Sequence, residues 1–210
     1  MDTIFWDVDT QVDFMEPDGK LYVPGAELIR PALAQLTRHA HQRKIRIVAS
    51  ADDHVPGHRE LSDHPDFKET FPPHCMRDTA GQGKIPETRL DHPLVIEPHP
   101  IDPQRLRQQV QRHAGDLLFH KHWFDVFSNP NVETVLAELS PRQIVVYGVA
   151  TDVCNRYAIE GLLTRHPQIQ LFAVTDAMKP IDAGREAALL ADWHRRGVRL
   201  VPVTDALRLA

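Results

Sequence analysis

Short apolar runs alternate along the chain with longer segments in which apolar residues recur every three or four positions. Six of the runs are rich in β-branched residues: Ile4 to Val8, Ile45 to Ser50, Leu94 to Glu97, Leu117 to His120, Ile144 to Tyr147 and Leu171 to Thr175. Continuous apolar runs of this length are typical of strands that are buried on both faces of a parallel sheet. A further run, Val198 to Val201, fits either an edge strand or a terminal loop.

The segments between these runs predict helices. The first carries one apolar stripe, and its Pro31 is tolerable because it falls near the helix start. That stripe consists of Leu28, Ile29, Leu33, Leu36 and Ala40. Four more helices are expected over 103–113, Val132 to Leu139, Val153 to Arg165 and Ala183 to Arg196, the last ending at Gly197.

Regular strand–helix alternation predicts an α/β fold in three layers, with helices on both faces of a six-stranded, mainly parallel, doubly wound sheet. The pattern shows no internal repeat and no second hydrophobic core, so residues 1–210 are expected to form one domain. Residues 52–93 differ from the rest because they are rich in Pro, His and Asp and have little periodicity. A loop of that length in a compact domain is usually functional.

Composition narrows the class of protein. The 210 residues are 42% hydrophobic and carry a formal net charge of −5, without a long run of Lys or Arg. We therefore expect no nucleic-acid partner and no membrane partner. The first residues lack the pattern of a signal peptide, and the two cysteines provide no disulfide framework, which predicts a reducing, cytoplasmic location.

Reactive side chains follow several of the predicted strands. Asp9 follows the first strand and Asp52 the second, Lys121 follows the fourth, and Cys154 comes shortly after the fifth. Ligands of open parallel sheets bind at the carboxyl ends of the strands. A carboxylate, an ammonium group and a thiol are therefore expected to meet at one rim of the sheet.

Cys154 is expected in the first turn of a helix that Thr151 or Asp152 caps. The free N–H groups and the dipole there favour a thiolate, and a nearby Lys121 would lower the pKa of the thiol further. A neighbouring carboxylate could accept and return a proton during attack on a carbonyl group. The alternative is that Cys154 is a buried cysteine that packs as a small hydrophobic residue.

Three motifs resemble those of the isochorismatase-like cysteine hydrolases. Residues 9–14 read D-T-Q-V-D-F and resemble the family's D-x-Q-x-D-F opening. Residues 121–127 read K-H-W-F-D-V-F and are similar to its K-x-x-x-(S/D)-x-F segment. Residues 148–154 read G-V-A-T-D-V-C and resemble its G-V-A-T-D-x-C segment around the nucleophile. The motifs occur in family order over most of the chain.

The resemblance implies a Rossmann-like fold and a catalytic triad of Asp9, Lys121 and Cys154. Asp9 would be the general base, Lys121 would hold the thiolate, and the reaction would pass through a thioester. The backbone N–H groups of Ala150 and Cys154 would form the oxyanion hole, helped by a cis peptide bond between Val149 and Ala150.

A metal site is the second implication. By spacing alone, the histidine-rich segment after the second predicted strand could simply be solvated. Nicotinamidases of this family, however, carry D-x-H after that strand and a W-P-P-H-C segment, which match Asp52, His54 and His74. His58 matches their remaining histidine less securely. The four residues would bind a divalent ion, zinc first, with iron or manganese as alternatives.

The nicotinamidase branch further implies a small amide as substrate, with nicotinamide first. Phe14 and Phe71 would line the ring pocket, Phe71 replacing a tryptophan, and relatives often assemble as homodimers or homotetramers. His120 and His122 flank Lys121, and either packing or a supporting role is open to them. Two rival functions also stay open: hydrolysis of another small amide, carbamoyl compound or enol ether, and a catalytically silent binding homologue.

Overall fold

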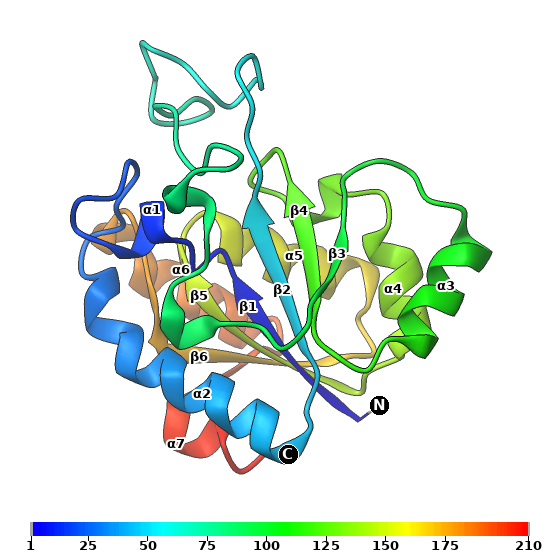
Figure 1. Cartoon of the computed structure of the whole chain (residues 1–210). Helices are drawn as coiled ribbons and strands as arrows, with labels where there is room; N and C mark the ends of the chain where they lie inside the picture. The colour runs from blue at the N-terminus through cyan, green and yellow to red at the C-terminus, as the bar shows by residue number, and fades with distance from the viewer. Residues whose placement is uncertain (1, 210) are drawn as a thin grey trace.

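A seven-stranded parallel sheet forms the centre of the computed structural model, which describes residues 2–209. The strand order is β3-β4-β2-β1-β5-β6-β7, so the chain builds outward from β1 in both directions (Figure 1). The strands are β1 Thr3–Val8, β2 Ile47–Asp52, β3 Leu94–Ile96, β4 Leu117–Lys121, β5 Gln143–Val149, β6 Gln170–Lys179 and β7 Arg199–Val201. The doubly wound α/β prediction is confirmed.

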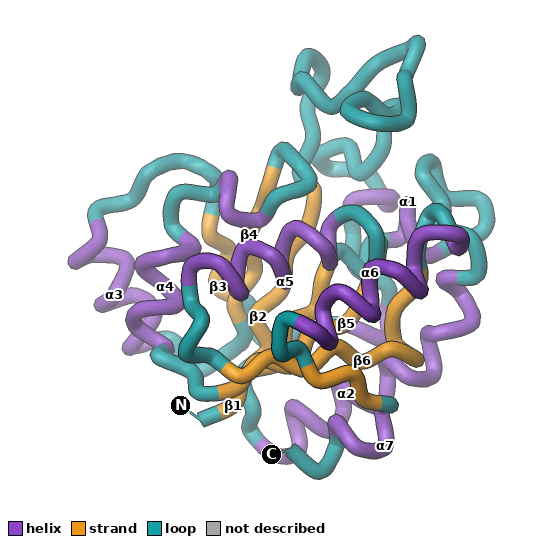
Figure 2. The backbone as a smooth tube through the Cα atoms, turned by 180° about the vertical axis from the view of Figure 1, so that it is seen from behind, coloured by secondary structure: helices purple, strands orange, loops and turns teal. Residues whose placement is uncertain are grey.

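Helices cover both faces of the sheet (Figure 2). One face carries α3 Pro103–Arg112, α4 Val132–Leu139, α5 Cys154–Arg165 and α6 Ala183–Arg195. The other carries α1 Val12–Met15, α2 Arg30–Arg43 and α7 Val203–Ala206. Four short 3-10 helices complete the described secondary structure: η1 Ala26–Ile29, η2 Ala80–Gln82, η3 Pro86–Thr88 and η4 Val126–Ser128.

The central strand shows why the apolar runs are continuous. In β1, Trp6 belongs to the core beneath α3 to α6, whereas Phe5 belongs to the core beneath α2 and α7. All six residues of β1 are buried. A strand covered on both sides needs apolar residues at successive positions, and in β1 only Thr3 at its start and Asp7 depart from that pattern.

Two predictions need correction. The sheet has seven strands rather than six, because residues 199–201 form a short edge strand beside β6 instead of a terminal loop. The second strand begins at Ile47 rather than Ile45. Lys44 takes a left-handed conformation that ends α2, and the N–H of Ile45 bonds to the carbonyl of Ala40, so Ile45 belongs to the helix end.

The segment between β2 and β3 projects beyond the carboxyl edge of the sheet, as the cyan and teal chain in Figure 1 shows. It is tied back to the body at several points. The Asp13 carboxylate accepts the N–H of Cys75 at 2.7 Å, as expected of a side chain that braces a loop. Lys84 pairs with Gln11 in an isolated antiparallel bridge. The segment is therefore a loop with a fixed base.

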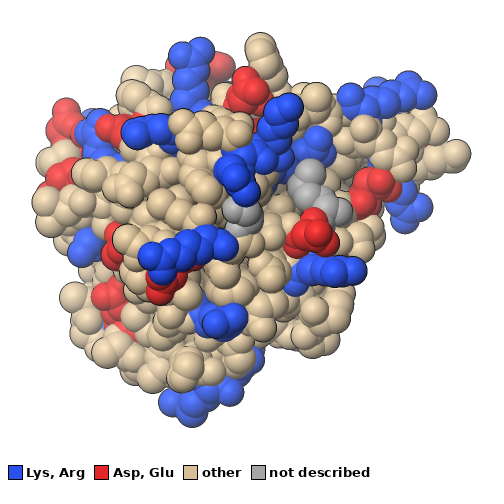
Figure 3. Space-filling model, turned by 90° about the horizontal axis from the view of Figure 1, so that it is seen from below, with Lys and Arg blue, Asp and Glu red and all other residues tan. Residues whose placement is uncertain are grey.

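Charged side chains of both signs are scattered over the face shown in Figure 3, among a larger uncharged area. No helix among residues 2–209 is both long and apolar enough to cross a membrane. The absence of nucleic-acid and membrane partners stays a prediction.

Candidate active site

Three side chains at or after the ends of separate strands meet at the carboxyl edge of the sheet. Asp9 directly follows β1, Lys121 is the last residue of β4, and Cys154 is the first residue of α5, five residues after β5 ends. Parallel strands end at the same edge, which brings residues that are far apart in sequence together. The predicted convergence is therefore present in the structure.

Lys121 connects the members of this group. Its Nζ lies 2.9 Å from Asp9 Oδ2 and donates to Asp52 Oδ1 at 2.5 Å. The same nitrogen lies 3.8 Å from the sulfur of Cys154. Asp9 and Lys121 are 0% exposed. Burial would lower the pKa of Lys121, but Asp52 and Asp9 raise it well above its ordinary value, so the side chain stays an ammonium group.

Asp9 is fixed by its neighbours on β1 and β2. Ser50 Oγ donates to Asp9 Oδ1 at 2.7 Å, and the backbone N–H of Asp9 donates to the carbonyl of Ser50 at 3.2 Å. Asp9 itself has a φ of 49°, a left-handed conformation that costs a non-glycine residue about 1 kcal/mol or more. Ser50 is a contact that the sequence reasoning missed.

Glycine at 148 lets β5 approach the end of β1. Its φ is 115°, and a Cβ atom there would lie 2.0 Å from the carbonyl oxygen of Val8. No other residue fits that space. The close approach brings the segment leading to Cys154 against the strand that carries Asp9.

The peptide bond between Val149 and Ala150 is cis, as the resemblance implied. The carbonyl of Ala150 accepts the N–H groups of Val153 and Asn155 at 3.1 and 3.0 Å. Within residues 2–209, the N–H groups of Ala150 and Cys154 have no hydrogen-bond acceptor. Two free donors thus flank the thiol, an arrangement that could stabilise an oxyanion.

The thiol itself differs from expectation. Burial raises the pKa of Cys154 well above its ordinary value, with Asp9 and Asp52 raising it and only Lys121 lowering it. The expected lowering of this pKa was wrong, because desolvation outweighs the ammonium group. The arrangement therefore suits a neutral thiol that gives its proton to Asp9 during attack.

A second cluster adjoins the first through Asp52. Ligand-type atoms of Asp52, His54, Glu60 and His74 all lie within 4.8 Å of one another, and each residue is at most 3% exposed. His54 Nε2, His74 Nε2 and Glu60 Oε2 are buried without a hydrogen-bond partner. Buried polar atoms that lack partners are costly unless something binds them. Two imidazole nitrogens and two carboxylates fit a divalent ion.

Glu60 is in this cluster and was missed by the sequence reasoning, which considered only Asp52 and the histidines of the segment as metal ligands. It lies six residues after His54, and its Oε1 lies 3.5 Å from His74 Nε2. His58 lies beside the cluster, with its Nδ1 3.3 Å from Nδ1 of His54. His58 is thus placed to orient His54 rather than to share its inner face.

Three hydrogen bonds to backbone groups orient the side chains of the cluster. His74 Nδ1 is 2.8 Å from the carbonyl oxygen of Pro72, which leaves its Nε2 facing the cluster. The Gln11 amide holds the backbone of Asp52 from both sides, donating to its carbonyl at 2.8 Å and accepting its N–H at 2.7 Å. The glutamine of the first motif is therefore a positioning residue.

The two histidines of the cluster have pKa values that are shifted in opposite directions. Burial lowers the pKa of His54 to about 4, so this ring is neutral at pH 7. Burial would also lower the pKa of His74, but the carboxylates of Asp52 and Glu60, 3.8 and 3.5 Å from its Nε2, raise it to about 9. Burial would raise the pKa of Asp52, yet Lys121 and the histidines hold it below its ordinary value. A cation at this point would take the place of the proton on His74.

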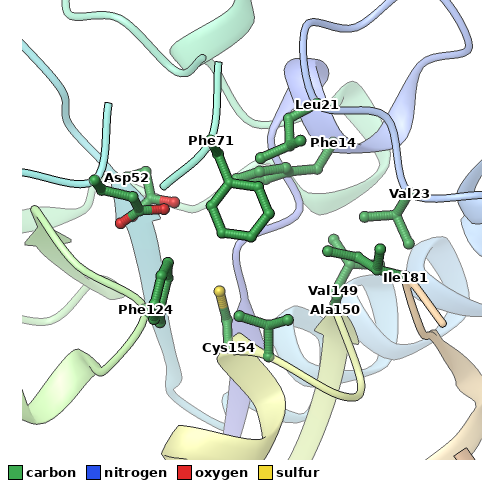
Figure 4. A pocket seen from close by; sticks show the side chains of 12 residues that line it. Phe14, Leu21, Val23, Asp52, Phe71, Phe124, Val149, Ala150, Cys154 and Ile181 are labelled. Carbon is green, nitrogen blue, oxygen red and sulfur yellow. The ribbon is translucent and has the colours of Figure 1, made fainter. Parts of the chain in front are cut away.

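A pocket connects the two clusters (Figure 4). Its walls include Phe14 and Phe71, as predicted, and also Phe124; the sulfur of Cys154 points into it. Its volume is only about 20 Å³, roughly the space that one water needs. A ring-sized substrate therefore requires side chains of the pocket wall to move.

His120 and His122 lie outside both clusters. His120 Nδ1 is 3.2 Å from the Glu97 carboxylate, and His122 Nε2 is 3.8 Å from Asp53 Oδ2. Asp53, Glu97 and His120 also bring three donor atoms together. Arg77 already binds both oxygens of Asp53, so we assign no ion to that set.

Comparisons with known proteins agree with this geometry. A sequence model of the isochorismatase domain matches residues 4–205. The chain belongs to the isochorismatase family. It is 34% identical over 201 residues to the nicotinamidase/pyrazinamidase of Mycobacterium tuberculosis, covering 92% of this chain and 95% of that protein.

Solved structures share the fold of this isochorismatase-family chain. The pyrazinamidase of Pyrococcus horikoshii in complex with zinc superposes with a TM-score of 0.76 at 22% identity, covering 96% of this chain and 99% of that one. The N-carbamoylsarcosine amidase of Thermoplasma acidophilum gives 0.71 at 20% identity, covering 97% of each chain. The prediction of a hydrolase is confirmed, and the amidase relatives agree with the predicted carbon–nitrogen bond specificity.

Proposed function

We propose that this chain hydrolyses the amide bond of a small molecule, with nicotinamide as the first substrate to test. The observation that carries the proposal is the buried contact of Lys121 with Asp9 and Cys154. Lys121 also contacts Asp52, which belongs to the second cluster. The 34% identical relative, a nicotinamidase/pyrazinamidase, supports the choice of substrate.

The reaction follows from the neutral thiol. As the sulfur attacks the amide carbon, its proton passes to Asp9, and the N–H groups of Ala150 and Cys154 stabilise the oxyanion. Asp9 then returns the proton to the nitrogen, the carbon–nitrogen bond breaks, and ammonia leaves a thioester. Asp9 next takes a proton from water, which attacks the thioester, and the acid leaves as the thiol is restored.

Lys121 contributes charge rather than a proton. Its ammonium group stays protonated and lies within 4 Å of both the carboxylate and the sulfur. It therefore favours thiolate over thiol in the transition state.

Asp52, His54, Glu60 and His74 would hold a divalent ion, zinc first, with iron or manganese as alternatives. The unpaired nitrogens and oxygen of the cluster support this assignment. When bound, the ion would supply a Lewis acid that binds a ring nitrogen of the substrate and orients its amide carbon toward Cys154. His58 would support His54 from outside the inner set.

A second candidate is hydrolysis of a related amide or carbamoyl compound. The fold shared with the N-carbamoylsarcosine amidase of Thermoplasma acidophilum supports it. A catalytically silent homologue is disfavoured, because the three reacting side chains are present and in contact. Cytoplasmic location and assembly as a homodimer or homotetramer stay predictions.

The test measures ammonia released from nicotinamide by the metal-loaded wild type and by Cys154→Ala. We expect release by the wild type alone, with the same metal content in both proteins. Comparable rates in both would overturn the mechanism. Hydrolysis of carbamoyl compounds in preference to nicotinamide would favour the second candidate.

A further inference from the structure

A larger cavity opens directly outside the catalytic pocket. Its volume is about 530 Å³, and it shares Phe71, Phe124 and Val153 with the inner pocket. The inner pocket has room for little beyond the reacting group. Any substrate part that extends past Phe71 and Phe124 would therefore lie in this outer cavity.

The carboxylates around the outer cavity are already engaged. The side chain of Asp152 accepts the backbone N–H groups of Ile181 and Asp182 at 2.8 and 2.9 Å. Asp66 accepts three backbone N–H groups of its own turn. Asp182 pairs with Arg185 at 3.1 Å. These groups shape the cavity wall but leave little to bind a ligand.

Arg156 differs from these carboxylates and from Arg185, and it is less exposed than Lys68, the other cation of this cavity without an ion pair among the described residues. Its Nε is buried and has no hydrogen-bond acceptor, and no carboxylate among residues 2–209 lies within 4.0 Å of its guanidinium group. Its one aromatic contact places the guanidinium carbon 5.1 Å from the ring centre of Tyr157. Arg156 also lies in the first turn of α5, where the helix end carries partial positive charge. Partial burial of a cation without a paired anion is costly, so the guanidinium group would gain from binding an anion.

The wall between the sulfur and Arg156 is aromatic. Phe71 and Phe124 meet edge to face with ring centres 5.7 Å apart, and Phe124 lies 5.9 Å from Tyr157. A flat or apolar spacer would fit along these rings. The wall thus connects the amide-reacting end of the site to a cationic end.

We propose that the outer cavity binds the anionic end of an elongated substrate, with Arg156 as its counter-ion. The substrate class is a monoamide of a dicarboxylic acid whose amide and carboxylate are separated by an aromatic or apolar spacer. This rests on the proposed amide hydrolysis at Cys154. It makes Arg156 a specificity-determining residue.

The test compares two amides of similar size, 4-(carbamoylmethyl)benzoate and the neutral 2-(4-acetylphenyl)acetamide, in which a methylene group separates the reacting amide from the ring. We expect the metal-loaded wild type to favour the anionic amide in kcat/KM by about tenfold, the effect of one charge-assisted hydrogen bond. Arg156→Met should bring the ratio close to one, and Arg156→Lys should restore part of it. Arg185→Met is the matched control, since its guanidinium is already paired, and should leave the ratio within about twofold.

Binding to metal-loaded Cys154→Ala protein, measured by calorimetry, separates this inference from the proposed function. A Kd about tenfold lower for the anionic amide, lost when Arg156→Met is added, supports the inference. Equal Kd values for the two amides, or a preference that survives Arg156→Met, overturn it. Failure of the wild type to release ammonia from any amide overturns the proposed function, while the binding contrast still decides the role of Arg156.

Discussion

The sheet edge and the projecting loop each supply half of the candidate site, and they hold their side chains in different ways. Asp9, Lys121 and Cys154 are positioned by the ends of β1, β4 and β5, whose backbones are paired in the central sheet. Glu60 and His74 lie on the segment between β2 and β3, which is tied down by individual contacts such as that of Asp13 with Cys75. The reacting groups are thus fixed by the fold, whereas the cluster depends on a loop and on what it binds.

Asp52 joins the two halves. One of its oxygens accepts the Lys121 ammonium, and the other lies 3.8 Å from His74 Nε2. A change in the loop can therefore reach the reacting groups through a single carboxylate. Loss of the loop cluster should therefore weaken catalysis but leave Asp9, Lys121 and Cys154 in place at the sheet edge.

The largest effect is expected at the sheet edge. Asp9→Asn should lower kcat by about 10³-fold, because a positioned general base contributes about 10²- to 10⁴-fold. Bound metal, measured by elemental analysis, should not change. Asp7→Asn is the control, since Asp7 is buried two residues earlier and pairs with Lys84 at 3.0 Å, away from the sulfur. We expect a lower melting temperature for that variant with kcat within about threefold of wild type. A fall of similar size in both variants would contradict the role of Asp9.

A smaller effect on catalysis is expected in the loop, where zinc affinity can distinguish the roles of Glu60 and His58. Glu60→Gln removes an inner donor and should weaken zinc affinity by at least about 100-fold, whereas loss of the supporting His58 in His58→Ala should cost about tenfold. Competition with a chromophoric chelator measures both affinities. Amide hydrogen exchange should also rise over residues 53–93 in Glu60→Gln and stay low in the sheet. If His58→Ala weakens zinc more than Glu60→Gln, then His58 belongs to the inner set.

The difference between the sheet edge and the loop also explains which features could be predicted from the sequence. The apolar runs predicted six strands and a mainly parallel sheet because strands buried on both faces leave a continuous pattern. Asp9, Lys121 and Cys154 followed from the strand ends. Glu60 and Ser50 could not be predicted in this way, because their roles depend on how a loop folds back and on a contact between neighbouring strands. The short edge strand β7 was ambiguous because three residues carry too little periodicity.

The raised pKa of Cys154 shows where reasoning from position failed. A helix start and a nearby lysine both favour thiolate, and the sequence displays both features. Burial, which opposes them, is a property of the whole fold, since the thiol lies in a pocket that Phe71 also lines and close to the carboxylates of Asp9 and Asp52. The magnitude of desolvation could not be predicted from the order of residues alone.

The smallest effect is expected in the alkylation rates of the two thiols, Cys154 at the sheet edge and Cys75 in the loop. A raised pKa means less thiolate at pH 7 to 8, so iodoacetamide should alkylate Cys154 at least about tenfold more slowly than a free cysteine, and the rate should still rise above pH 9. Burial also raises the pKa of Cys75, which is 0% exposed and lies on the loop. Its alkylation should therefore depend on loop opening and accelerate when a chelator removes the metal, whereas that of Cys154 should change less. Peptide mapping by mass spectrometry resolves the two sites. A Cys154 rate that levels off below pH 8 would instead mean that Lys121 outweighs desolvation and that the thiolate is present before substrate binds.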